Sequence, residues 1–191
     1  MPPAGARSRF LGTNPYTIGV PGPTPEQPIV LDMATSVVAR GKIVMAEKHG
    51  EPIPPGWAMT DAGEPTTDAA EALLGAVLPM AGYKGSGLAM MIDILCGVLT
   101  GAASGQDVVD LYDQSERHQD IGHFFLAIDV AAFCAPETFQ SRVERYAGQL
   151  RDQPRVAGVD QILLPGDKER AAADQAALAG VLLSDTDVAD L

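Results

Sequence analysis

Residues 80–101 read MAGYKGSGLAMMIDILCGVLTG and place one lysine among three glycines, directly before an apolar run. Gly82, Gly85 and Gly87 surround Lys84 and allow a tight backbone turn. The apolar run predicts a helix over residues 86–100. A lysine in this position either points into water from the turn or meets an anion at the start of the helix. The residues alone favour the exposed lysine, because a charged side chain in a turn is ordinarily solvated.

The glycine spacing matches neither of the common phosphate-binding motifs. A P-loop has four residues between its first glycine and a Gly-Lys pair that is followed by Ser or Thr, and this segment differs in spacing and in order. A Rossmann fingerprint follows a strand directly, whereas residues 73–81 form a poor strand with Pro79 inside it. Physics alone therefore leaves the anion site as one of two alternatives.

Short β-favouring runs alternate with helical patterns along the rest of the chain. Strands are predicted over residues 16–20, 28–32 and 123–130, with a strand and turn over 160–167. Helices are predicted over residues 37–48 with Gly50 as the stop, from Thr67 or Asp68 onward, over 136–154, and from 168 onward. In the 136–154 helix an apolar stripe is formed by Phe139, Val143, Tyr146 and Leu150. This alternation indicates an α/β or α+β fold.

Two aspartates interrupt apolar segments. Asp32 closes a strand just before a helix, where the turn over residues 32–36 is expected to cap that helix with a hydroxyl or carboxylate. The alternative for Asp32 is a ligand-binding group at the edge of a sheet. Asp93 lies inside the apolar helix and is expected at a helix surface or a subunit interface.

The remaining candidate residues predict neither a nucleophile nor a metal site. His49, His118 and His123 lack a nucleophilic partner or metal-ligand spacing, so no catalytic residue is assigned to them. Cys96 and Cys134 are far apart in apolar surroundings and are expected to be buried free thiols in a reducing compartment.

Composition narrows the class of protein. The 191 residues suit one domain, and the net charge of −12 argues against a nucleic-acid partner. Residues 1–10 lack the apolar core of a signal peptide and are expected to be disordered or a mis-called start, and residues 11–191 are expected to form a single α/β domain with a C-terminal helical segment. The longest apolar run, residues 88–99, is too short to span a membrane, so a cytoplasmic protein is expected.

Five motifs follow one another in the order and spacing of a known family: GTNPYTIGVPG, IVLDMATSVVARGKI, IPPGWAMTDAGEPTTD, LPMAGYKGSGLAMMIDILCGVLTGAASG and VAGVDQILLPGD. Together they resemble the malate/L-lactate dehydrogenase family of the second type. This family also contains sulfolactate, ureidoglycolate and diketogulonate oxidoreductases and reductases of cyclic imino acids. The resemblance runs from about Leu11 to the C-terminus. It implies an α/β fold with a non-Rossmann mixed sheet and packed helices, with the N-terminal part of the family fold missing.

The resemblance also implies an activity. Such proteins bind NAD or NADP and transfer a hydride between nicotinamide and a small 2-hydroxy or 2-oxo acid such as malate or lactate. They are homodimers with active sites near the subunit interface, so a homodimer with a small-molecule substrate is expected here.

The family motifs assign site residues by resemblance. The cofactor-binding positions correspond to Asp32, Met33, Ala34, Lys84, Gly166, Asp167 and Lys168. The positions expected to line the site are Gly12, Thr13, Asn14, Pro15, Thr66, Thr67 and Asp68. With the family in view, the anion interpretation of Lys84 becomes the favoured one.

Family members are considerably longer at the N-terminal side. That portion carries the catalytic histidine and a basic residue that holds the substrate carboxylate, so no catalytic residue is expected in this chain. The chain therefore resembles the C-terminal portion of an enzyme: a truncated product, one part of a split enzyme or a mis-called start. The alternative is an inactive remnant that only binds nucleotide or dimerises. Exposed apolar surface is expected in either case.

Overall fold

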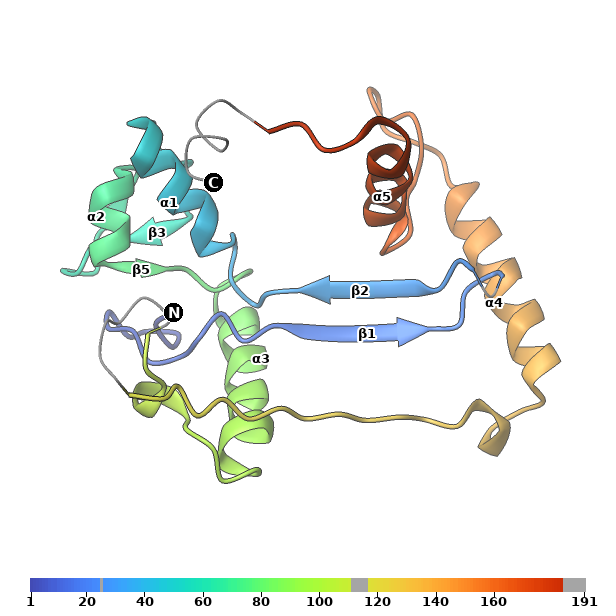
Figure 1. The fold of residues 1–191 in the computed structure, drawn as a ribbon, viewed down its shortest axis with the longest axis horizontal. Helices are drawn as coiled ribbons and strands as arrows, with labels where there is room; N and C mark the ends of the chain where they lie inside the picture. The colour runs from blue at the N-terminus through green and yellow to red at the C-terminus, as the bar shows by residue number, and fades with distance from the viewer. Residues whose placement is uncertain (25, 111–116, 184–191) are drawn as a thin grey trace. The chain divides into compact units, whose positions relative to one another are not determined.

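The computed structural model describes residues 1–24, 26–110 and 117–183 (Figure 1). The chain divides into two compact units. Unit 1 comprises Met1–Tyr16 and Met33–Ala127, and unit 2 comprises Thr17–Asp32 and Ile128–Leu191. The single domain expected over residues 11–191 stays a prediction, because two compact units can belong to one domain.

Strands and helices are mixed in both units, which confirms the α/β class. The elements of unit 1 are α1 (Arg40–His49), β3 (Ala58–Met59), β4 (Pro65–Thr66), α2 (Ala69–Leu74), β5 (Ala76–Val77), α3 (Tyr83–Asp93), a π-helical turn (Ile94–Val98) and a 3-10 turn (Gly105–Asp107). Those of unit 2 are a 3-10 turn (Val130–Ala132), α4 (Pro136–Arg151) and α5 (Asp167–Ala179). The strands β1 (Tyr16–Val20) and β2 (Ile29–Met33) lie in unit 2 except for Tyr16 and Met33.

Unit 1 is built around a small antiparallel sheet with the strand order β4-β3-β5. Ala58 is paired with Thr66 on one side and with Val77 on the other. The apolar core that covers this sheet consists of Val38, Ile43, Ile53, Ala58, Ala69, Ala72 and Val77. Because Ile53 is buried and Trp57 packs against this core, the proline-rich stretch before β3 is an ordered part of the unit.

The start of α1 differs from the expectation. The helix begins at Arg40, and the preceding Ala39 has an extended backbone and no capping side chain. The predicted cap by residues 32–36 is therefore wrong. The Thr35 hydroxyl donates to the Thr13 carbonyl and the Ser36 hydroxyl to the Val38 carbonyl, so neither side chain reaches the helix amides. The predicted stop at Gly50 is confirmed by its left-handed backbone, with φ of 66°.

Helix α2 begins where the sequence predicts it. The Asp68 carboxylate accepts a hydrogen bond from the Glu71 amide at 2.9 Å. The Glu71 carboxylate in turn accepts one from the Thr66 hydroxyl at 2.8 Å. The Asp68 cap satisfies an amide at the start of the helix and explains its position, and the Thr66 hydroxyl links the Glu71 carboxylate to the Asp68 amide at 3.0 Å.

Helix α3 begins at Tyr83, three residues before the predicted start, and its N-cap Gly82 has a φ of 62°. Gly85 permits a close approach, because a Cβ atom at this position would lie 2.3 Å from the Met80 carbonyl oxygen. A Cβ atom at Gly87 would meet nothing within 4 Å. The helix continues into the π-helical turn and so ends near the predicted boundary.

In unit 2, β1 and β2 run antiparallel as neighbours (Figure 1). Helix α4 begins with Pro136 in its first turn, which suits a residue without an amide hydrogen. Its less exposed face includes Phe139, Val143 and Leu150, as predicted, together with Ala147. Tyr146 is 60% exposed and lies outside this face, so that part of the predicted stripe is wrong.

Two predicted strands are absent from the described residues. Residues 123–130 and 160–164 carry β-favouring side chains but form no ladder with another strand. Just after the second segment, the Val30 amide of β2 donates to the Pro165 carbonyl at 3.1 Å. A β-favouring run becomes a strand only where a neighbour supplies backbone hydrogen bonds.

Three further expectations concern the N-terminus, the two cysteines and membrane-spanning helices. Met1 is buried, and its carbonyl accepts hydrogen bonds from the amides of Phe10 and Leu11; the expected disorder of residues 1–10 stays a prediction. Cys96 and Cys134 are free but half-buried rather than buried. Within the described part of the chain, no helix has the length and apolar character needed to cross a membrane.

The two glycines of α3 predict opposite effects of the same substitution. Gly85→Ala should lower the free energy of unfolding of unit 1 by about 1–3 kcal/mol, because the new methyl group overlaps the Met80 carbonyl. Gly87→Ala should raise it by about 0.5–1 kcal/mol, because alanine favours the helix and meets open space. Urea unfolding followed by the fluorescence of Trp57, the single tryptophan, measures both. Equal effects of the two substitutions would contradict the packing of α3 on Met80.

Candidate functional site

A fully buried threonine joins three segments of unit 1. Thr35 is 0% exposed, and both its amide and its hydroxyl donate to the Thr13 carbonyl at 2.8 Å. The hydroxyl also lies 3.2 Å from the Asn14 carbonyl oxygen. The Thr35 carbonyl accepts a hydrogen bond from the Met80 amide at 2.9 Å. The segments around residues 13, 35 and 80 are therefore held side by side.

The same segments position the start of α3. The Asn14 side-chain amide donates to the Ala89 carbonyl at 2.8 Å, and the Ser86 hydroxyl accepts from the Ala4 amide at 2.9 Å. The Val37 amide donates to the Leu78 carbonyl at 2.9 Å, directly before the glycine-rich turn. The expected site segments 12–15 and 33–34 thus belong to the same connected part of unit 1 as Lys84.

Lys84 lies exposed in the first turn of α3. The Gly85 amide donates to the Met80 carbonyl at 3.0 Å, and the Ser86 amide donates to the Gly82 carbonyl at 3.1 Å. The amides of Tyr83 and Lys84 have no hydrogen-bond acceptor among the residues that the structure describes. Two open amides at the positive end of a helix, next to an ammonium group, fit a phosphate or carboxylate.

Met33, the last residue of β2, and Ala34 lead directly into Thr35. The Tyr16 hydroxyl donates to the Met33 sulfur at 3.6 Å, and Ala34 is half-buried. Since Thr35 is fixed by its hydrogen bonds, this segment is held at a defined place beside residues 12–15.

A cavity of about 860 Å³ also opens in unit 1. Gly12–Pro15 contribute to its wall, whereas Lys84 does not. Asp93 lies in this wall half-buried and accepts a hydrogen bond from the Gly105 amide at 3.1 Å. Its carboxylate therefore has a partner within the unit, which the expectation of a helix-surface or interface residue did not include.

The predicted site-lining residues Thr66, Thr67 and Asp68 are placed at the start of α2. The side chains of Thr66 and Asp68 are used in the cap of that helix, and Thr67 is exposed. Thr66 and Asp68 therefore have a role in the fold, and the role of all three residues in a site stays a prediction.

The other predicted cofactor residues lie in unit 2. Asp32 is exposed, and its carboxylate accepts a hydrogen bond from the Thr17 hydroxyl at 2.8 Å. Gly166 has a φ of 92° just before α5, and a Cβ atom there would lie 3.4 Å from the Val30 backbone. A left-handed residue close to β2 favours glycine at this position. Lys168 is exposed in the first turn of α5.

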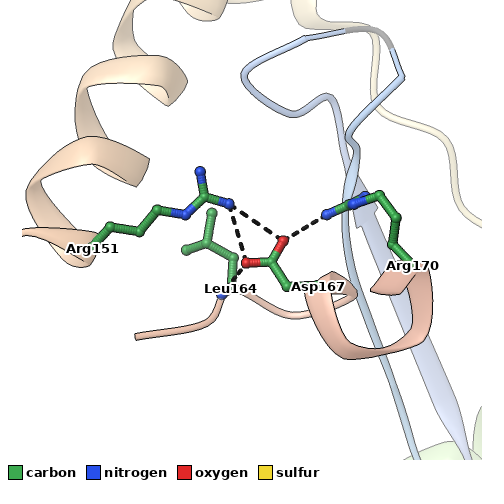
Figure 2. Close-up of polar contacts among 4 residues, drawn as sticks. All are labelled: Arg151, Leu164, Asp167 and Arg170. Carbon is green, nitrogen blue, oxygen red and sulfur yellow. Dashed lines mark hydrogen bonds and ion pairs between the residues drawn. The ribbon is translucent and has the colours of Figure 1, made fainter. Parts of the chain in front are cut away.

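Figure 2 shows Asp167 between two arginines, one from α4 and one from α5. Arg151 approaches both carboxylate oxygens, at 3.3 and 3.1 Å, and Arg170 lies 2.6 Å from Oδ1. The Leu164 amide donates to Oδ2 at 2.9 Å. Burial alone would raise the pKa of Asp167, but the Leu164 amide and the two guanidinium groups outweigh it and lower the pKa.

Sequence reasoning missed three residues that contact the predicted site, and two of them do so across a long stretch of sequence. Thr35, Arg151 and Arg170 each contact residues that the predicted site includes. Arg170 follows Asp167 at the i,i+3 spacing at which side chains meet on a helix. This ion pair was therefore the one contact that the sequence could have predicted, once a helix is assumed there. Among the described residues, no cluster of three or more His, Cys, Asp or Glu could hold a metal ion.

The whole chain, residues 1–191, matches the sequence profile of the malate/L-lactate dehydrogenase family. This chain belongs to that family. Ureidoglycolate dehydrogenase (NAD(+)) of Escherichia coli O157:H7 is 35% identical over 183 residues, which are 96% of this chain and 52% of the relative. The (2R)-3-sulfolactate dehydrogenase (NADP(+)) of Chromohalobacter salexigens is 34% identical over 171 residues, which are 90% of this chain and 49% of the relative.

The solved structure of sulfolactate dehydrogenase from Methanocaldococcus jannaschii has the same fold, with a TM-score of 0.83 and 35% identity. The match covers 97% of this chain and 52% of that structure. This malate/L-lactate dehydrogenase family member thus spans about half the length of its relatives. The resemblance that its motifs suggested is confirmed.

Removal of the Thr35 hydroxyl tests the connection between the site segments. Thr35→Val should lower the free energy of unfolding of unit 1 by about 1–2 kcal/mol, since the Asn14 carbonyl loses a donor in a partly buried place. The exposed Thr67→Val is the matched control and should change it little. Urea unfolding with Trp57 fluorescence is the measurement. Equal stability of the two variants would show that the Thr35 hydroxyl does not stabilise the contact between these segments.

The lowered pKa of Asp167 predicts a pH-dependent stability in unit 2. An ionised Asp167 stabilises the fold above its ordinary pKa of 3.8, and this contribution is lost as the pH falls through the lower folded value. Asp167→Asn should therefore cost about 1–2 kcal/mol at pH 7 and progressively less below pH 3.8. Urea unfolding by circular dichroism across this range measures the difference. Asp174→Asn, an exposed change on the same helix, is the control, and a pH-independent cost of the Asp167 variant would contradict the assignment.

Proposed function

We propose that this chain supplies the cofactor-binding part of an NAD- or NADP-dependent oxidoreductase that acts on small 2-hydroxy or 2-oxo acids such as malate or lactate. Family membership and the names of its relatives support this. Ureidoglycolate and sulfolactate are both 2-hydroxy acids, and the two relatives named for them carry NAD(+) and NADP(+) in their names. The shared chemistry is removal of a hydride from the carbon next to a carboxylate.

The observation that carries the proposal is the start of α3. An exposed lysine and two open amides lie in one helical turn. The hydrogen bonds of Thr35 to Thr13 and Met80 hold the neighbouring segments in place. In the proposed role, the Lys84 ammonium and the amides of Tyr83 and Lys84 hold an anionic group of the cofactor. A lysine suits a phosphate because it acts as a flexible point charge.

The other predicted contacts remain part of the proposal. Met33 and Ala34 offer backbone groups in a segment fixed by Thr35. Asp32 and the Gly166–Lys168 loop are proposed cofactor contacts by family resemblance. Bound nicotinamide would supply the hydride carrier, and the residues of this chain would orient it.

Proton transfer is proposed to come from the part of the family fold outside these residues. His49 ends helix α1, and the side chains of His118 and His123 are exposed. None of the three has the partner that a general base requires among the described residues, so none is assigned to catalysis. A cytoplasmic homodimer is the proposed setting.

Replacement of Lys84 tests the cofactor site directly. Lys84→Met should weaken binding of NADH or NADPH at least about tenfold, because a charge-assisted contact to an anion is lost. Lys42→Met removes the same charge from an exposed position on α1 and is the matched control. Nucleotide fluorescence titrated with each purified protein gives the dissociation constants. Equal affinities for the two variants would refute the role of Lys84.

Turnover separates the proposed enzyme from an inactive remnant. In the presence of the half of a relative that this chain does not match, the protein should consume NADH or NADPH with a 2-oxo acid. Nucleotide binding without any turnover under these conditions would leave a binding module rather than an oxidoreductase.

A further inference from the structure

A cavity of about 420 Å³ opens in unit 2, and its wall is rich in arginine. The charged side chains that line it are Arg151, Arg155, Arg170, Asp167 and Asp174. The wall therefore carries one more positive than negative side chain, although the whole chain has a net charge of −12. A local excess of positive charge against the sign of the whole protein favours an anionic ligand.

The Asp167 carboxylate holds two of these arginines in place. Arg151 from α4 and Arg170 from α5 bond to it from different directions (Figure 2). With the Leu164 amide, the carboxylate accepts four contacts, two on each oxygen. Because a carboxylate has about four acceptor positions, Asp167 has none left for a hydroxyl group of a ligand. Asp167 is therefore a positioning residue for the two guanidinium groups.

The three arginines keep hydrogen-bond donors for a ligand. Arg151 and Arg170 use only Nη2 in their contacts with Asp167, and Arg155 uses only Nη1, which donates to the Asp160 carbonyl. The other guanidinium nitrogens have no acceptor within the part of the chain that the structure describes. Planar guanidinium groups with open N–H donors around one cavity suit the oxygens of a phosphate group.

Family membership leaves the choice between NAD and NADP open, because one relative is named for NAD(+) and another for NADP(+). The two cofactors differ by a phosphate on the ribose 2′ position. An acidic side chain that accepts from the free 2′-hydroxyl favours NAD, and an arginine near that position favours NADP. In this cavity Asp167 is already saturated while the arginines have open donors, so the chemistry of the wall favours the phosphate.

We propose that the cavity lined by Arg151, Arg155 and Arg170 binds the 2′-phosphate of NADP, and that this chain therefore prefers NADP to NAD. Asp167 belongs both to this wall and to the Gly166–Lys168 loop that is proposed to contact the cofactor. The volume lies in the usual range of small-molecule sites, about 300–1,000 Å³. The assignment rests on the proposed function, since it states which cofactor the oxidoreductase uses.

Titration of the purified chain with NADPH and with NADH tests the preference. NADPH should bind at least about tenfold more tightly than NADH. Arg155→Met should weaken NADPH binding about tenfold and leave NADH binding within about twofold, because only NADPH carries the 2′-phosphate. Arg155 is the best position to change, since it contacts the Asp160 carbonyl and leaves the Asp167 contacts intact. Nucleotide fluorescence gives the dissociation constants.

Matched variants exclude a general effect of charge. Arg145→Met removes the same charge from an exposed position on α4 outside the cavity and should leave both affinities unchanged. Arg155→Lys keeps the charge but loses the planar fork, so it should restore part of the NADPH affinity that Arg155→Met loses. Lys84→Met should weaken both nucleotides alike, and this separates the proposed site at α3 from the cavity in unit 2.

Two smaller probes identify the source of the phosphate. Adenosine 2′-monophosphate should displace NADPH from the unchanged chain, and adenosine 5′-monophosphate should not. Inorganic phosphate that binds in an Arg155-dependent manner without displacing NADPH would assign the cavity to a separate anion and overturn the proposal.

Other outcomes would overturn the proposal as well. Equal affinities for NADPH and NADH, or equal effects of Arg155→Met and Arg145→Met, would remove the preference for NADP and leave the proposed oxidoreductase in place. Failure of the chain to bind either nucleotide would refute the proposed function and this assignment together.

Discussion

The arrangement of unit 1 depends on the hydrogen bonds of a single buried residue. Thr35 has no contact with solvent, and its amide, hydroxyl and carbonyl are all bonded to other segments of the chain. These partners are 22 residues before it and 45 residues after it in the sequence, at Thr13 and Met80. In a buried environment such groups cannot exchange their partners for water at low cost. The segment at residues 33–34 and the glycine-rich approach to α3 therefore keep a fixed relation.

The same constraint explains why the start of α3 can serve as a site. Glycine allows many backbone conformations, so the turn before Lys84 would be flexible without an additional restraint. The contact of Gly85 with Met80, the Asn14 bond to Ala89 and the Thr35 bond to Met80 supply that restraint. The helix amides are thus held in place, and an anion need not order them on binding.

The extent to which sequence predicted the fold follows the range of each interaction. The stop of α1 at Gly50, the cap of α2 at Asp68 and the start of α4 at Pro136 depend on neighbouring residues and were predictable. The failed cap of α1 and the missing strand at residues 123–130 depend on distant partners. Likewise the motif around Lys84 predicts a site role for that residue, and the pair of Asp167 and Arg170 is local in sequence, whereas Thr35 and Arg151 became visible only through contacts with residues distant in the sequence.

The central claim is that an anionic part of the cofactor binds at the start of α3, beside the segment held by Thr35. Backbone amide chemical shifts during a titration with NADH test it most directly. The amides of Tyr83, Lys84 and Ala34 should shift together with one dissociation constant. Unchanged shifts at these three amides, with saturable shifts only around Asp93 and Val109 in the wall of the cavity, would contradict it.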